Sequence, residues 1–120
     1  MEKLKLFEEI YNSLKEGIIP RVDLHVHTNW TDGQHSVIEM HEQACKKSLS
    51  HIFFSEHSRK ESGTWFYEFV KQVDSLPKNI CRAIKGTEVK ILNFNGEIDI
   101  NENFYSECDL VMASVHRFPG

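Results

Sequence analysis

The feature that most constrains this chain is the alternation of short apolar segments with longer amphipathic ones. A short apolar segment predicts a buried strand, and apolar residues spaced three and four apart predict a helix. Strands that alternate with helices in this way are typical of an α/β fold with a parallel sheet. The expected strands lie at residues 21–28, 51–55, 82–91 and 109–115, and the expected helices at 2–16, 37–45 and 65–76.

Local signals mark where several of these elements begin and end. Gly17 stops the first helix, and Ser36 followed by Glu39 is a capping-box signature for the second. Asn95-Gly96 is a strong signal for a tight hairpin before the last strand. The first helix is expected to dock through one apolar stripe, formed by Leu4, Phe7, Ile10, Tyr11 and Leu14.

Length and composition bound the class of protein. The 120 residues suffice for one domain, which we place at residues 21–120 behind a docking helix at 1–20. A hydrophobic content of 40% with 27% charged residues is typical of a globular chain rather than a disordered one. The net charge of -4 gives no electrostatic reason to expect nucleic acid or an anionic membrane as a partner. Three widely spaced cysteines, no apolar run that could span a bilayer and no signal peptide predict a cytoplasmic protein.

The first expected strand carries a chemically distinctive pattern, Asp23-Leu24-His25-Val26-His27. Alternation along a strand would place the apolar residues on one face and the aspartate and both histidines on the other. Two imidazoles at this spacing can grip a metal ion, and imidazole suits zinc, iron and manganese better than calcium. Taken alone, the pair is equally well explained as polar residues on a half-exposed strand.

Further candidate ligands lie at or near the ends of the other expected strands. In parallel α/β folds, sites form where the carboxyl ends of the strands meet. Several independent strands that each deliver such a residue to one edge make a metal centre the favoured interpretation. The candidates are His25, His27, His57, Glu88 and His116, with Asp32 in the loop after the first strand.

Six stretches of the sequence belong together, namely Asp23-Leu24-His25-Val26-His27-Thr28, Thr31-Asp32-Gly33, Ser55-Glu56-His57, Gly86-Thr87-Glu88, Asn95-Gly96-Glu97-Ile98-Asp99 and Ala113-Ser114-Val115-His116. In this order they resemble the PHP (polymerase and histidinol phosphatase) domain family, closest to the single-domain bacterial PHP phosphatases. The resemblance implies the first half of a distorted (β/α)7 TIM-like barrel, with up to three divalent metal ions at the carboxyl ends of its strands. It also implies hydrolysis of a phosphoester on a small phosphorylated metabolite or a nucleotide end, with a metal-activated water as the nucleophile.

The family's metal ligands carry over to matching positions of this chain. By resemblance, His25 and His27 bind the first metal, and Glu88 bridges the first and second. His116 binds the second metal in the same scheme. His57 and Asp32 bind the third. The mixed set of histidines and carboxylates suits zinc, manganese and iron alike.

Other residues are expected to support this site. Asp23 and Glu56 are candidates for residues that orient a ligand histidine without binding the metal themselves. Arg59, Lys60 and Arg117 could bind the substrate phosphate, although a solvated surface charge is the more common role for each. The family usually has Thr-Asp-His where this chain has Ser55-Glu56-His57, and the longer carboxylate could alter the orientation of the histidine.

The family's second half supplies another histidine and a late Asp-x-His pair, which this chain lacks. We therefore expect a fragment of a longer protein or a truncated one, with self-association through the open barrel edge as the alternative. We also expect weak or absent catalysis from this chain by itself, because metals held by partial ligand sets bind poorly.

Two other interpretations stay open at this point. An amidohydrolase-type barrel also begins with His-x-His, but Gly86-Thr87-Glu88 argues against it. A catalytically inactive PHP remnant, kept as a structural module, is the second alternative. Trp30 could wall the pocket or shield the barrel mouth. Residues without a supporting motif, which we leave outside the site, are His35, His41, His51, Glu97 and Asp99.

Overall fold

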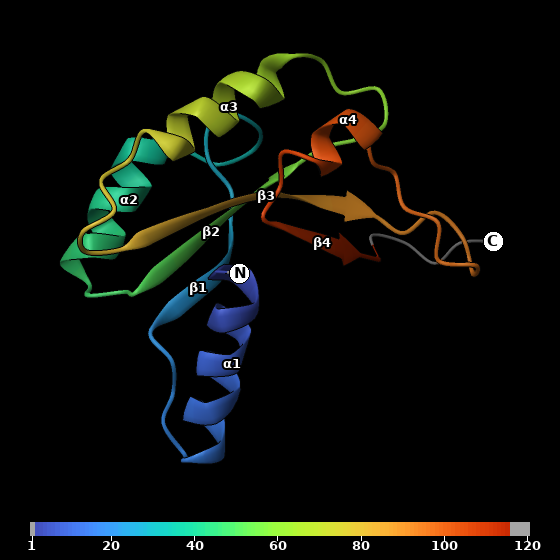
Figure 1. The fold of residues 1–120 in the computed structure, drawn as a ribbon. Coiled ribbons are helices and arrows are strands. Elements are labelled where there is room, and N and C mark those ends of the chain that lie inside the picture. The colour runs from blue at the N-terminus through green and yellow to red at the C-terminus, as the bar shows by residue number, and fades with distance from the viewer. Residues whose placement is uncertain (1, 116–120) are drawn as a thin grey trace.

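A computed structural model of the chain describes residues 2–115, with side chains from residue 5 onward. Four strands form one parallel sheet in the order β1-β2-β3-β4, which confirms the predicted α/β alternation (Figure 1). The sheet curls into the expected half-barrel. The elements are α1 (Glu2–Lys15), β1 (Val22–Val26), α2 (Val37–Lys46), β2 (His51–His57), α3 (Trp65–Asp74), β3 (Arg82–Lys90), α4 (Glu102–Tyr105) and β4 (Leu110–Ser114).

The main hydrophobic core lies between the sheet and the two helices α2 and α3 (Figure 1). The capping box of Ser36 and Glu39 is present at the start of α2, so this predicted helix start is confirmed. Helix α3, expected from apolar residues spaced three and four apart at 65–76, buries Phe66, Phe69, Val70 and Val73. The fully or nearly fully buried residues of this core include Val37, Ala44, Ile52, Phe54, Phe66, Phe69, Val70, Val73, Leu76 and Phe104.

Helix α1 packs on the opposite face of the sheet, and of the described side chains in the predicted stripe only Ile10 takes part. Leu6 is buried against Phe53 and Ile84, with Ile10 beside it. Phe7, Tyr11 and Leu14, in contrast, are each at least 46% exposed. The prediction was wrong for Phe7, Tyr11 and Leu14, because the sheet contacts the side of the helix that carries Leu6 and Ile10.

Strand β1 contains an irregularity that the alternating pattern did not predict. Asp23 pairs with Ile52 and Val26 pairs with Phe54, so three steps along β1 match two steps along β2. This extra residue is a β-bulge, which changes the face to which the following side chains point. Leu24 consequently packs with α1, whereas Val26 joins the main core. The prediction that one face of this strand carries all its apolar residues was therefore wrong.

The segment between β3 and β4 differs from a simple hairpin. The turn at Asn95-Gly96 forms, with Gly96 at a positive φ of 84°, and Ile91 and Ile98 make a single antiparallel bridge. The short helix α4 follows, which the sequence pattern did not reveal. Its Phe104 stacks on Phe66 of α3 at 4.5 Å between ring centroids, so α4 closes the edge of the main core. Across residues 2–115, no helix is both long enough and apolar enough to cross a membrane.

Candidate metal centre

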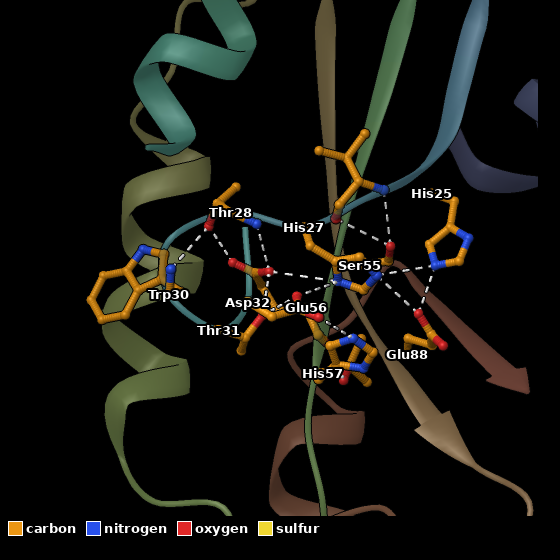
Figure 2. A network of polar contacts seen from close by, with 12 residues as sticks. His25, His27, Thr28, Trp30, Thr31, Asp32, Ser55, Glu56, His57 and Glu88 are labelled. Atoms are coloured by element: carbon orange, nitrogen blue, oxygen red, sulfur yellow. Dashed lines mark hydrogen bonds and ion pairs between the residues drawn. The ribbon is translucent and has the colours of Figure 1, made fainter. Parts of the chain in front are cut away.

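His25, His27 and Glu88 meet at the carboxyl edge of the sheet (Figure 2). The Glu88 Oε1 atom lies 2.6 Å from His25 Nε2 and 3.0 Å from His27 Nε2. The two Nε2 atoms are 3.1 Å apart, and the imidazole planes differ by 69°. Strands β1 and β3, which are not neighbours in the sheet, thus bring three potential ligand atoms to one point.

A bound cation would satisfy His25 Nε2, His27 Nε2 and Glu88 Oε1 better than hydrogen bonds among them do. If both Nε2 atoms carry hydrogen and donate to Glu88, the two N–H groups also face each other at 3.1 Å. A single cation accepts a lone pair from all three atoms at once. Donors of a tetrahedral site with bonds of about 2.0–2.1 Å are roughly 3.3 Å apart, close to the spacing here. The group therefore fits a small divalent ion after a slight expansion.

Glu88 is nearly buried, and neighbouring residues fix its orientation. Its second oxygen, Oε2, accepts a hydrogen bond of 2.8 Å from the hydroxyl of Ser114 on β4. Two residues earlier on β3, Gly86 leaves no space for a side chain. A Cβ atom there would collide with the carbonyl of Leu110 and lie 2.6 Å from the Phe53 ring. The Gly86-Thr87-Glu88 motif thus combines close strand packing with a carboxylate held at the site.

A second group of potential ligands adjoins the first and consists of His27, Asp32 and His57. His57 Nε2 lies 3.1 Å from Asp32 Oδ2, which links the end of β2 to the loop after β1. Gly33 holds that loop close to the strand. Its N–H bonds to the carbonyl of Thr28, and a Cβ atom at this position would lie 2.6 Å from the His27 carbonyl.

The two groups share His27, and ring geometry assigns it to the first. The rings of His27 and His57 stack at 4.2 Å between centroids with planes only 7° apart. An ion bound by imidazole lies in the ring plane, so one ion cannot lie in both of these planes. The Nε2 atom of His27 instead faces His25 and Glu88. Asp32 and His57 are left as a separate pair of potential ligands.

The other nitrogen of His27 faces two carboxylates. Nδ1 is buried and has no hydrogen-bond partner, although Asp32 Oδ1 lies at 3.8 Å and Glu56 Oε1 at 3.9 Å. Both distances are within ion-pair range but too long for hydrogen bonds. When Nε2 holds a metal, Nδ1 carries the proton and needs an acceptor of this kind. This orphaned atom is therefore also consistent with a metal ligand.

Glu56 is fully buried and holds the loop that follows β1. Its carboxylate accepts hydrogen bonds from the backbone N–H of Thr28 at 2.9 Å and from the hydroxyl of Thr31 at 3.0 Å. The Thr28 hydroxyl donates to the same carboxylate. Burial raises the pKa of Glu56 above its ordinary value of 4.5, while the bonds from both threonines oppose that rise. Glu56 thus connects β2 to the segment that carries Asp32.

The remaining predicted site residues occupy several environments. Asp23 accepts a hydrogen bond from the backbone N–H of His25 at 3.2 Å, so it contacts the backbone of that histidine. Arg59 and Lys60 are exposed on the loop after β2. This loop is anchored because the backbone N–H of Lys60 donates to Asp99 Oδ1 at 2.8 Å. His116 and Arg117 lie outside the described residues.

His35, His41 and Trp30 have partners outside the two groups of potential ligands. His41 on α2 is buried, and its Nε2 lies 2.8 Å from the carbonyl oxygen of Cys81. His35 is an exposed partner of Glu39. Trp30 stacks beside Trp65 of α3, and its indole N–H donates to Gln72 at 2.8 Å. Trp30 therefore attaches the loop to α3.

Comparison with known proteins identifies relatives of the chain. A profile of the PHP domain matches residues 23–119. The DNA polymerase/3'-5' exonuclease PolX of Bacillus subtilis is 34% identical over 102 residues, which cover 78% of this chain and 18% of the polymerase. A probable phosphatase of Clostridium acetobutylicum is 31% identical over 98 residues, covering 79% of this chain and 40% of the phosphatase. A probable phosphatase of Vibrio atlanticus is 33% identical over 100 residues, which cover 81% of this chain and 40% of the phosphatase. The chain thus spans less than half the length of each of these relatives.

Proposed function

This chain belongs to the PHP domain family, and from that premise we propose that it carries part of a metal-dependent phosphoesterase site. The observation that carries the proposal is the convergence of His25 Nε2, His27 Nε2 and Glu88 Oε1 within 3.1 Å of one another. One carboxylate with two imidazoles is a ligand set suited to zinc, manganese or iron. Further ligands proposed by resemblance are Asp32, His57 and His116.

The chemistry follows from what such residues can hold. When bound, a divalent cation activates water for attack on phosphorus and offsets the charge of the phosphoryl oxygens. His25 and His27 would hold the ion through Nε2, and Glu88 would contribute one negative charge. Ser114 keeps the second oxygen of Glu88 oriented. The exposed loop with Arg59 and Lys60 supplies positive charge for a substrate phosphate.

The proposed substrate class is a phosphorylated metabolite or a nucleotide end. The phosphatase names of several relatives support a phosphomonoester, and the exonuclease name of another supports a nucleotide end. The net charge of -4 favours a small substrate over a long stretch of nucleic acid, because it provides no general attraction to a polyanion.

Release of inorganic phosphate from a panel of phosphomonoesters, with added Mn²⁺, Zn²⁺ or Fe²⁺, tests the proposal. We expect slow turnover that requires the metal and falls at least about tenfold in Glu88→Gln, because the substitution removes the ligand charge. Glu42→Gln, an exposed position on α2, is the matched control and should retain the parent rate.

Two results would count against this function. Turnover that is independent of metal, or equal in the parent and Glu88→Gln, would place the activity elsewhere. Metal uptake without any phosphate release would favour the alternative of a PHP module without catalysis.

A further inference from the structure

The β-bulge of β1 falls between Asp23 and Val26, so it includes His25 and ends just before His27. A side chain from β2 contacts the backbone between the two histidines. The backbone N–H of Val26 donates to the hydroxyl oxygen of Ser55 at 3.1 Å. The same hydroxyl donates to the carbonyl of Val26 at 3.2 Å. In a regular parallel ladder, neighbouring strands bond through backbone N–H and carbonyl groups. Here a serine side chain of the neighbouring strand bonds to both the N–H and the carbonyl of one residue.

Ser55 is completely buried, and its hydroxyl is a small group able to donate and accept at once. Val26 lies between His25 and His27 in the chain, so the position of its backbone sets the position of both. Where the bulge ends, the two Nε2 atoms approach to 3.1 Å. We propose that Ser55 is a positioning residue, which fixes the bulge of β1 so that His25 and His27 converge on Glu88.

Ser55 would have two effects, one on the metal-free chain and one on metal binding, and only the second rests on the proposed function. The first effect is that Ser55 fixes the backbone of Val26 by hydrogen bonds in the metal-free chain. The second effect is that the fixed backbone places the His25 and His27 side chains in position to bind a metal ion. The two effects can be measured separately because hydrogen exchange needs no metal.

The experiment compares the parent chain with Ser55→Ala, Ser55→Thr and Ser50→Ala. Threonine keeps the hydroxyl. Ser50 provides a matched control, since its hydroxyl donates to the carbonyl of Arg21 at 3.2 Å, at the opposite end of the same two strands. Hydrogen exchange of the Val26 amide is measured without metal, and the dissociation constant for Co²⁺ is measured by visible absorption.

We expect Ser55→Ala to speed exchange of the Val26 amide about tenfold, as loss of one hydrogen bond allows. The dissociation constant for Co²⁺ should rise about tenfold or more, the usual effect of removing a group that orients a ligand. Ser55→Thr and Ser50→Ala should stay within about twofold of the parent in both measurements. Circular dichroism establishes that each variant is folded.

Parent-like exchange and parent-like Co²⁺ affinity in Ser55→Ala would overturn the positioning role, as would a Ser55→Thr variant that behaves like Ser55→Ala. If Ser55→Ala does not fold, Ser55→Cys replaces it, because a thiol keeps the shape but bonds weakly. Faster Val26 exchange in that variant supports the proposal, and unchanged exchange contradicts it. A parent chain that takes up no Co²⁺ would contradict the proposed function, while the exchange data still decide the role of Ser55.

Discussion

Glu56 is the single residue on which the loop beside the candidate metal centre depends most. Its fully buried carboxylate accepts bonds from the Thr28 backbone, the Thr28 hydroxyl and the Thr31 hydroxyl. Replacing it by alanine would leave the buried N–H and hydroxyl of Thr28 without their acceptor, while the Thr31 hydroxyl would keep a longer bond of 3.4 Å to Asp32 Oδ1. A buried donor without an acceptor is more costly than an absent hydrogen bond.

We therefore expect Glu56→Ala to lower the free energy of unfolding by about 3 kcal/mol, measured by urea denaturation of the metal-free chain. Glu42→Ala, an exposed glutamate on α2, should change it by less than about 0.5 kcal/mol. Equal stability of the two variants would show that Glu56 does not hold the loop.

The sequence predicted which potential metal ligands lie together better than it predicted the residues that orient them. The meeting of His25, His27 and Glu88 was predictable because imidazoles and carboxylates gathered at strand ends are typical of metal sites. Ser55 and Ser114 were missed because a serine in a strand gives no signal of its partner. Both lie within motifs that pointed to the site, so proximity in sequence was the one available hint. The bond between Ser114 and Glu88 depends on strand pairing, which no local pattern encodes.

Among the elements, the end of α2 shows a local strain that can be relieved. Ser48, just past this helix, has a positive φ of 60°, a conformation that glycine adopts without cost. The Leu49 N–H bonds to the Ala44 carbonyl across this turn. The side chain of Arg21 covers the same turn, where its Nε donates to the Ser48 carbonyl at 3.1 Å. The turn therefore also ties α2 to the start of β1.

We expect Ser48→Gly to raise the free energy of unfolding by about 0.5–1 kcal/mol, because it removes the steric cost of the left-handed backbone. Thermal or urea denaturation measures the effect. Ser75→Gly is the matched control, since Ser75 follows α3 with a φ of -80° and gains nothing from glycine. It should lower the free energy of unfolding by a similar amount. Destabilisation by Ser48→Gly would contradict this description of the turn.

Elements with strong periodicity or caps were predictable, and those set by tertiary contact were not. Helix α3 and the capped start of α2 follow directly from residue spacing. The bulge in β1 was hidden because alternation of Val22, Leu24 and Val26 looks regular. Helix α4 is only one turn long, too short for a periodic signal. The buried side of α1 is chosen by the sheet, which the sequence of the helix alone does not describe.

At the scale of the whole molecule, the sheet has helices on both faces and two outer strands that each pair on one side only. Within residues 2–115, β1 and β4 are these outer strands. Exposed apolar side chains remain on α1 and in the segment that follows it, notably Tyr11 and Ile19. Self-association through an open edge stays a prediction, and a measured mass decides it.

The central claim is that the carboxyl edge of this sheet holds a divalent metal ion through His25 and His27. Native mass spectrometry after incubation with Zn²⁺, Mn²⁺ or Fe²⁺ tests it most directly, since metal content and oligomeric mass come from one spectrum. The variants are His25→Ala/His27→Ala and, as a matched control, His35→Ala/His51→Ala. We predict that the parent and the control retain at least one ion per chain and that the first variant loses it. Equal metal content in all three proteins, or none in the parent, would contradict the claim.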